Sequence, residues 1–82
     1  MSYQVYILFS DKDKRRYIGS TNNLDRRLAE HNKGLVVSTK YRIPLKLIYT
    51  ESYASESEAR NRERFLKTHK GYNELKKLLV GP

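Results

Sequence analysis

Apolar side chains recur along the chain with two different periods, and the change of period predicts where strands give way to helices. Residues 3–9 are largely aromatic or aliphatic on both faces, which is typical of a strand in the middle of a sheet. A polar connection over residues 10–16 suits a hairpin that returns through Tyr17 and Ile18. The pattern therefore predicts two antiparallel strands with Tyr6 and Tyr17 beside each other.

A helical period begins near residue 23 and continues to about residue 33, where Gly34 supplies a stop signal. Arg27 and His31 fall on the same stripe as the leucines of this helix. Charged groups are rarely buried without a partner, so these two side chains need an explanation. The leucines predicted to point inward are Leu24, Leu28 and Leu35.

The second half of the chain predicts one strand and two helices. Residues 35–44 show no period and indicate an ordered loop, and residues 45–49 form the third strand. Ser55, with a glutamate three residues later, opens a helix expected to run to about residue 69. Gly71 is expected to interrupt it. The last helix is predicted over residues 72–80, with Leu75, Leu78 and Leu79 inward.

The order of these elements predicts an α+β fold, with a three-stranded, largely antiparallel sheet flanked by helices. The chain of 82 residues contains no repeat or linker, so residues 1–82 indicate a single domain. The absence of cysteine excludes disulfides and thiolate metal sites. There is no membrane-length apolar run and no signal-peptide core, and we therefore expect a cytoplasmic protein without a membrane partner.

Positive charge adds an expectation about partners. The chain carries 17 Lys and Arg against 9 Asp and Glu, a formal net charge of +8 that is spread evenly. Such an excess favours nucleic acid, although a protein that is merely basic has the same composition. The basic side chains either contact phosphates or form a solvated helix face with local pairs. The candidate nucleic-acid contacts are Lys40, Arg42, Arg60, Arg64, Lys67 and Lys70.

Several polar residues have the chemistry that phosphodiester hydrolysis needs, which is a base for water and charge on the phosphate. Tyrosine becomes a base only where a cation favours its phenolate, and Arg27 would supply that cation and clamp a phosphate. Glu63 lies at helical spacing from apolar neighbours, near the packing face. Each also has an ordinary reading: a strand tyrosine, a snorkelling arginine, a satisfied core histidine at His31, or a glutamate paired with Arg62.

The intact triplet Tyr17-Ile18-Gly19, preceded by Gln4-Val5-Tyr6, resembles the paired motifs of the GIY-YIG nucleases. The resemblance covers nearly the whole chain and is closest to small stand-alone members of the excinuclease type, in which the nuclease domain has no appended DNA-binding modules. It implies a metal-dependent endonuclease that hydrolyses phosphodiester bonds in DNA, in repair or recombination. The positions that match the family's functional residues are Tyr6, Tyr17, Arg27, His31 and Glu63.

The same resemblance implies a role for each of these residues. Tyr17 would act as the base with Tyr6 as its partner, Arg27 would bind the phosphate, and His31 would bind the phosphate or tune Tyr6. Glu63 would hold Mg²⁺ or Mn²⁺ weakly, with substrate phosphate completing the coordination. The expected partner is DNA more than RNA, together with a protein partner that supplies targeting.

Two positions depart from the family pattern, Ser20 and, less seriously, Gln4 in place of the first triplet's glycine, and Ser20 together with the small size of the domain favours a second reading. Ser20 stands where the enzymes often carry a lysine, and Lys40 or Arg42 from the loop is the expected substitute. The family's late asparagine matches Asn73 only across a gap. The alternative is a nucleic-acid-binding module that keeps the nuclease fold with little or no catalysis. A purely structural interaction protein ranks last.

Overall fold

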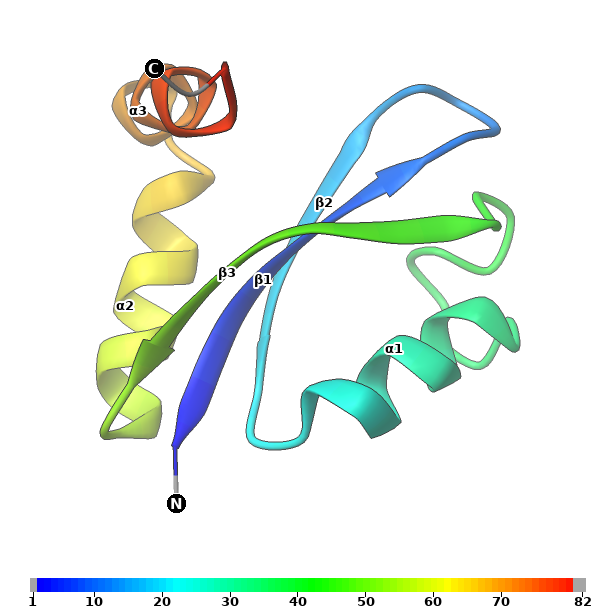
Figure 1. Cartoon of the computed structure of the whole chain (residues 1–82), viewed down its shortest axis with the longest axis horizontal. Coiled ribbons are helices and arrows are strands. Elements are labelled where there is room, and N and C mark those ends of the chain that lie inside the picture. Colours follow the sequence, from blue (N-terminus) through cyan, green and yellow to red (C-terminus); the bar gives the residue numbers. More distant parts are fainter. Residues whose placement is uncertain (1, 81–82) are drawn as a thin grey trace.

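The computed structural model of the chain describes residues 2–80 and confirms the α+β fold. A three-stranded antiparallel sheet lies between helices, with the strand order β2-β1-β3 (Figure 1). The prediction that the first strand is central is therefore correct. The elements in chain order are β1 (Tyr3–Ser10), β2 (Arg16–Thr21), α1 (Leu24–Asn32), β3 (Leu45–Tyr53), α2 (Glu56–Leu66) and α3 (His69–Val80).

The central strand β1 supplies a hydrophobic core to each face of the sheet. Val5 and Ile7 point to one face and pack with residues of α2 and α3. Tyr6 and Leu8 point to the other face, where α1 covers them. Figure 1 shows α1 on one side of the sheet and α2 with α3 on the other. Because side chains alternate along a strand, one strand connects two separate layers of helices.

Helix α1 has the ends that its sequence predicts. The side chain of Asn23 accepts a hydrogen bond from the backbone N–H of Arg26, and Gly34 follows the helix with a φ of 76°. Leu24 and Leu28 pack inward, but Leu35 is 68% exposed, so its predicted inward position is wrong. Leu35 lies beyond the left-handed residue, where the helical spacing no longer applies.

Strand β3 continues to Tyr53, four residues past its predicted end at residue 49. It is an edge strand, and its alternating side chains form a polar network on the side of α2. Glu51 accepts hydrogen bonds from the hydroxyls of Tyr49 and Tyr53 and from the guanidinium of Arg62. These bonds extend the strand beyond its apolar segment.

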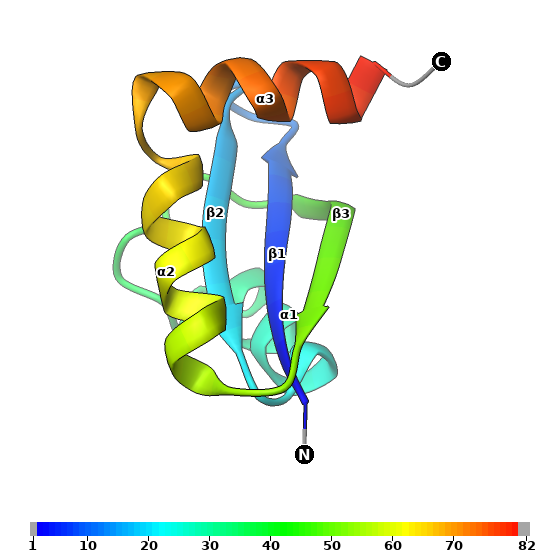
Figure 2. The same ribbon diagram turned by 90° about the vertical axis from the view of Figure 1, so that its left-hand side faces the viewer.

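Helix α2 begins at the predicted cap, where Ser55 accepts from the backbone N–H of Glu58 at 3.2 Å. It ends at Leu66, and Gly71 does not interrupt a helix as predicted but lies inside α3. A Cβ at position 71 would overlap the backbone of Phe65, so this glycine allows α3 to cross closely over the end of α2 (Figure 2).

The inward face of α3 differs in one position from the prediction. Leu75 is buried and Leu79 packs against the core, but Leu78 is 41% exposed and its predicted inward position is wrong. Leu78 is three residues from Leu75 and falls at the margin of the contact face. None of the helices within residues 2–80 combines the length and apolar character that crossing a membrane requires.

Candidate active site

Tyr6 lies at the centre of a buried cluster of polar side chains between β1 and α1. Its hydroxyl is hydrogen-bonded to Nε2 of His31 at 2.9 Å. The other ring nitrogen of His31, Nδ1, is 2.8 Å from Oγ1 of Thr39, which lies in the loop after α1. All three side chains are buried. A neutral imidazole has one donor and one acceptor nitrogen, so His31 satisfies both hydroxyls.

Gly19 allows Tyr6 to occupy this position. The register pairs Tyr6 with Gly19, and a Cβ at position 19 would lie 2.6 Å from the hydroxyl oxygen of Tyr6. Tyr17 points to the same face of β2, and its ring centroid is 6.3 Å from that of Tyr6 and 5.0 Å from that of His31. The expected proximity of the two tyrosines is confirmed, and the glycine of the triplet makes room for it.

Burial decides the protonation of this cluster. It raises the pKa of Tyr6 to about 12, although the guanidinium of Arg27 acts in the opposite direction. Burial and the charge of Arg27 lower the pKa of His31 to about 4. Arg27 acts on Tyr6 in the expected direction, but desolvation outweighs the cation and the pKa of Tyr6 is raised. At neutral pH Tyr6 is an un-ionised hydroxyl and His31 an uncharged imidazole.

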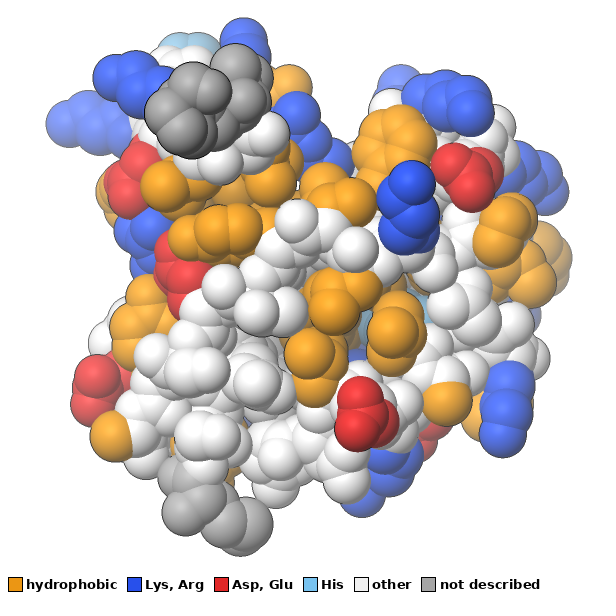
Figure 3. Space-filling model, viewed as in Figure 1, with side chains coloured by type: hydrophobic (Ala, Val, Ile, Leu, Met, Phe, Trp, Pro, Cys, Tyr) orange, Lys and Arg blue, Asp and Glu red, His pale blue; other side chains and the backbone are white. Residues whose placement is uncertain are grey.

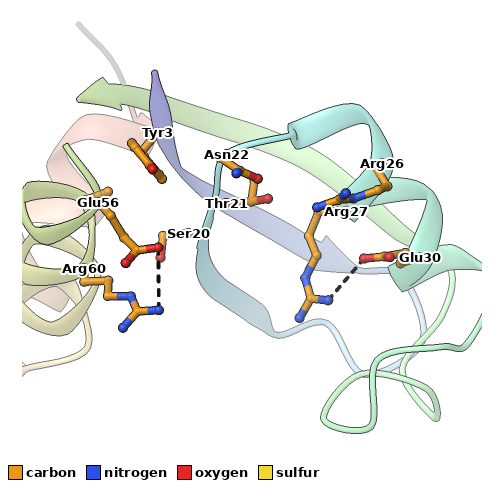
Figure 4. A pocket seen from close by; sticks show the side chains of 10 residues that line it. Tyr3, Ser20, Thr21, Asn22, Arg26, Arg27, Glu30, Glu56 and Arg60 are labelled. Atoms are coloured by element: carbon orange, nitrogen blue, oxygen red, sulfur yellow. Dashed lines mark hydrogen bonds and ion pairs between the residues drawn. The ribbon is translucent and has the colours of Figure 1, made fainter. Parts of the chain in front are cut away.

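Arg27 projects from α1 toward a hollow of about 370 Å³ that separates α1 from α2 (Figure 4). We call this the inter-helix hollow. The guanidinium of Arg27 forms an ion pair of 3.2 Å with Glu30, and both side chains are more than a third exposed. An exposed pair of this kind contributes little stability, so the guanidinium is free to turn to a phosphate.

The opposite wall of the inter-helix hollow is α2, with Arg60 and Glu56. The floor is the end of β2 and the residue after it, with Ser20, Thr21 and Asn22.

Glu63 on α2 approaches the same end of β2 from the other face of the sheet. Its side chain is 22% exposed, and its carboxylate accepts hydrogen bonds from Ser20 Oγ at 2.6 Å and Lys67 Nζ at 2.7 Å. Burial opposes ionisation, but Lys67 and Ser20 outweigh it, so the pKa of this carboxyl lies below its usual value. The negative charge of Glu63 also contributes to the raised pKa of Tyr6.

A second hollow of about 260 Å³, which we call the Glu63 hollow, lies along α2 and shares Arg60 with the inter-helix hollow. Its lining residues are Arg60, Glu63, Arg64 and Lys67. An ionised carboxylate with a hydroxyl beside it is a donor set that suits a hard cation such as Mg²⁺. Three cationic side chains oppose that cation unless an anion is also present. The residues therefore fit a divalent ion that arrives with phosphate oxygens.

The five residues predicted for the site fall into two groups that meet at β2. His31 bonds to Tyr6 and Tyr17 lies against it, whereas Ser20 bonds to Glu63 and lines the inter-helix hollow with Arg27. His31 has no exposed surface, so of its two expected roles the geometry favours support of Tyr6 over contact with a phosphate. Among residues 2–80 no three Asp, Glu or His side chains are grouped as ligands for a metal ion.

The six predicted nucleic-acid contacts do not form one surface. Arg60, Arg64 and Lys67 line the Glu63 hollow. Arg42 bonds to Asp13 at 2.6 Å and to the backbone carbonyl of Arg16, so it fixes the loop to the hairpin. Its predicted role as a substitute for the lysine missing at position 20 is therefore wrong, because its guanidinium is already bonded to Asp13 and Arg16 at the hairpin.

The other two predicted contacts, Lys40 and Lys70, are exposed, and neither lines the inter-helix hollow, the Glu63 hollow or the hollow of about 520 Å³ beside the hairpin. Lys40 lies 5.0 Å from the ring centroid of Tyr41. Asn73 is exposed on α3. These positions remain predictions as nucleic-acid contacts.

Sequence reasoning did not assign Thr39 or the bond between Ser20 and Glu63. Thr39 lies in a loop without periodicity, and nothing in its local pattern distinguishes it. Ser20 follows the triplet directly, and the sequence alone indicated only that the lysine often found at this position in the family is missing. In the structure its hydroxyl fixes the carboxylate of Glu63 instead.

Known proteins are similar to this chain in sequence and in fold. A family model for the GIY-YIG catalytic domain matches residues 2–76. The UPF0213 protein CPE1444 of Clostridium perfringens is 44% identical over 68 residues, covering 82% of this chain and 71% of its own. The UPF0213 protein SH2523 of Staphylococcus haemolyticus is 41% identical over 75 residues, covering 90% of each chain.

A solved structure gives the same result for the fold. The solution NMR structure of the UPF0213 protein BH0048 from Bacillus halodurans superposes with a TM-score of 0.60 at 33% identity. The match covers 100% of this chain and 89% of that one. The motif residues that surround Tyr6 thus lie on a sheet and helices that this relative shares. The chain belongs to the GIY-YIG nuclease superfamily, alongside the small UPF0213 proteins.

Proposed function

We propose that this protein is a divalent-metal-dependent endonuclease that hydrolyses phosphodiester bonds in DNA, in repair or recombination. The observation that carries the proposal is that the end of β2 connects to functional side chains on both helices. Ser20 bonds to Glu63 of α2 and lines the inter-helix hollow together with Arg27 of α1. The basic lining of the adjoining hollows supports a polyanionic substrate.

The two tyrosines take different roles in this proposal. Tyr6 is buried and keeps its proton, so it donates a hydrogen bond and positions its neighbours. Tyr17 is partly exposed and is the phenol that an attacking water can reach, so it acts as the base. His31 and Thr39 hold Tyr6 in place through the buried hydrogen bonds.

The phosphate lies between the helices in this arrangement. Arg27 turns from Glu30 to the phosphate oxygens, for which its planar donor fork is suited. Glu63 would hold a Mg²⁺ or Mn²⁺ ion, and Lys67, whose side chain is half exposed, would release the carboxylate for it. A divalent ion supplies neutralisation of the charge on the phosphate.

One observation favours the alternative, a nucleic-acid-binding module with little or no catalysis. Both oxygens of the Glu63 carboxylate accept hydrogen bonds, one from Ser20 and one from Lys67. If Lys67 stays in place, the carboxylate is a partner for a cationic side chain and holds no metal ion.

A cleavage assay separates the two functions. Labelled single-stranded, duplex and branched DNA are incubated with the protein in Mg²⁺, in Mn²⁺ and in EDTA. We expect nicking that requires the metal and that falls about 100-fold or more in Glu63→Gln and in Arg27→Ala. The matched controls are Glu58→Gln, which keeps the helix cap, and Lys33→Ala, which removes a cation from the far end of α1.

The outcomes are distinct. Nicking that survives both substitutions at the wild-type rate overturns the assignment of the site. DNA binding by the wild type without cleavage of any substrate in either metal overturns the catalytic proposal and supports the binding module.

A further inference from the structure

A third hollow lies outside the candidate active site, between the β1–β2 hairpin and the helices α2 and α3. We call it the hairpin hollow, and its volume of about 520 Å³ exceeds that of either neighbour. In Figure 3 the surface dips between α3 and the hairpin, with hydrophobic side chains on either side. The apolar residues that line the hairpin hollow are Phe9, Ile18, Leu66 and Leu75.

The rim of the hairpin hollow is cationic. The lining includes one tyrosine, Tyr72, and no acidic side chain among the described residues. Its four cations are Lys14, Arg15, Arg16 and Lys67. An apolar floor with an aromatic side chain and a cationic rim fits a ligand that joins a flat ring to an anion, as a nucleotide does.

Arg16 provides a second, independent observation. Within residues 2–80, its Nη1 atom is buried and has no hydrogen-bond partner. The centre of the guanidinium lies 5.7 Å from the ring centroid of Tyr72, and Lys76 lies at the same distance from that ring. A buried donor without a partner is costly, and Arg16 also lines the hairpin hollow, so turning its guanidinium outward to an oxygen or ring nitrogen of a nucleobase, or to a phosphate, would satisfy the donor.

The hairpin hollow continues the line of the other two along α2. Arg60 lines both the inter-helix hollow and the Glu63 hollow, and Lys67 lines both the Glu63 hollow and the hairpin hollow. Glu63 and Lys67 are one helical turn apart, about 6 Å along the axis. Stacked DNA rises about 3.4 Å per nucleotide, so the third hollow lies within about two nucleotides of a phosphate at Glu63.

We propose that the hairpin hollow binds an unpaired nucleobase next to the cleavage position, stacked on Tyr72, so that the substrate is DNA with an unpaired segment. This inference rests on the proposed function, because it places the nucleic acid along α2. Its chemistry is that of sequence-tolerant single-strand binding, in which an aromatic side chain contacts the base and cations contact the phosphates.

Binding without metal tests this proposal apart from catalysis. Fluorescence anisotropy in EDTA compares a blunt duplex, a duplex with a four-nucleotide 3′ tail, and the same duplex with an abasic tail. The abasic tail keeps the phosphates and removes the bases. We expect the wild type to bind the base-bearing tail about 10-fold more tightly than the abasic tail, which is the scale of one base–aromatic stack.

Variants of Tyr72 and a matched tyrosine locate the effect. Tyr72→Ala should abolish the difference between the two tails, and Tyr72→Phe should retain it. Tyr41→Ala is the control, because Tyr41 is also exposed and also lies beside a lysine but lines none of these three hollows. Equal binding of both tails by the wild type, or an equal effect of Tyr72→Ala and Tyr41→Ala, overturns the proposal. Cleavage that fails while the difference persists overturns only the catalytic function.

Discussion

Tyr6 and His31, 25 positions apart in the sequence, share a hydrogen bond of 2.9 Å in the core between β1 and α1. The bond joins the two structural layers that carry the predicted base and the predicted phosphate contact. Because both side chains are buried, the stability of the fold and the geometry of the site depend on the same interaction.

Replacing His31 by alanine should destabilise the protein by about 2–4 kcal/mol. The substitution leaves a cavity and removes the partner of two buried hydroxyls, those of Tyr6 and Thr39. Urea denaturation measures the loss. His69, the other histidine of the chain, is exposed, and His69→Ala should change the free energy of unfolding by less than about 0.5 kcal/mol. Equal effects of the two substitutions would show that the buried hydrogen bonds contribute no stability.

Stability should fall as the pH is lowered from 6.5 to 5. The folded pKa of His31 is about 4, below its ordinary value of 6.5, so the unfolded chain binds a proton in this range that the folded chain does not. The contribution is complete above pH 6.5 and is lost as the pH falls toward 4. We expect a loss of roughly 1–2 kcal/mol between pH 6.5 and 5, measured by urea denaturation.

Two variants assign this pH dependence. His69→Ala should leave the slope between pH 6.5 and 5 unchanged. Glu51, whose carboxyl pKa is lowered to about 2 despite burial, through Arg62 and two tyrosines, acts at lower pH. Its stabilisation is present above about pH 4.5 and is lost below it, so Glu51→Gln should flatten only that lower segment. A slope between pH 6.5 and 5 that disappears in His69→Ala would contradict the assignment to His31.

Gly19→Ala should disturb the site through the position of Tyr6. The new methyl group would lie within 3 Å of the hydroxyl end of Tyr6, which cannot move away freely because His31 holds it. We expect a destabilisation of about 1–3 kcal/mol and slower cleavage of DNA. Gly34→Ala is the comparison, because nothing lies within 4 Å of its added Cβ, so its cost of roughly 1–2 kcal/mol comes from the positive φ alone and cleavage should be unaffected. Normal cleavage by Gly19→Ala would show that the site tolerates displacement of Tyr6.

Arg62 and Arg60, two residues apart on α2, should respond in opposite ways to alanine substitution. Arg62 is largely buried between Glu51 and Glu74, and its loss leaves buried acid without a counter-ion, at a cost of about 2 kcal/mol or more. Arg60 makes an exposed pair of 3.8 Å with Glu56, so its loss should cost less than about 0.5 kcal/mol.

Their effects on DNA binding should be reversed. Arg60→Ala should weaken binding and reduce its dependence on salt, because Arg60 lines two of the hollows. Arg62→Ala, measured where it remains folded, should leave the salt dependence unchanged. Denaturation and salt-titrated anisotropy give the two readouts, and the same salt dependence in both variants would remove Arg60 from the proposed contact surface.

Local signals predicted the starts of α1 and α2 and the approach of Tyr17 to Tyr6, because a cap or a hairpin is determined by neighbouring residues, whereas α3 begins three residues before its predicted start. Long-range partners were not predictable. Arg62 and Glu63 occupy adjacent helix positions, and spacing alone leaves open which of them faces the site. Glu51, eleven residues earlier on β3, binds Arg62 and thereby separates it from Glu63. Leu35 shows the same limit, since its spacing fits a helix that has already ended at Asn32.

The place of Tyr6 on β1 has a consequence for heating. Strand β1 is hydrogen-bonded on both edges, whereas β2 and β3 each have one free edge, so its amide hydrogens should be among the slowest in the chain to exchange with solvent. Fraying of the outer strands or helix ends would leave this phenol where it is. The buried cluster should therefore keep its arrangement until the whole molecule melts, and an inactivation curve should coincide with the loss of secondary structure.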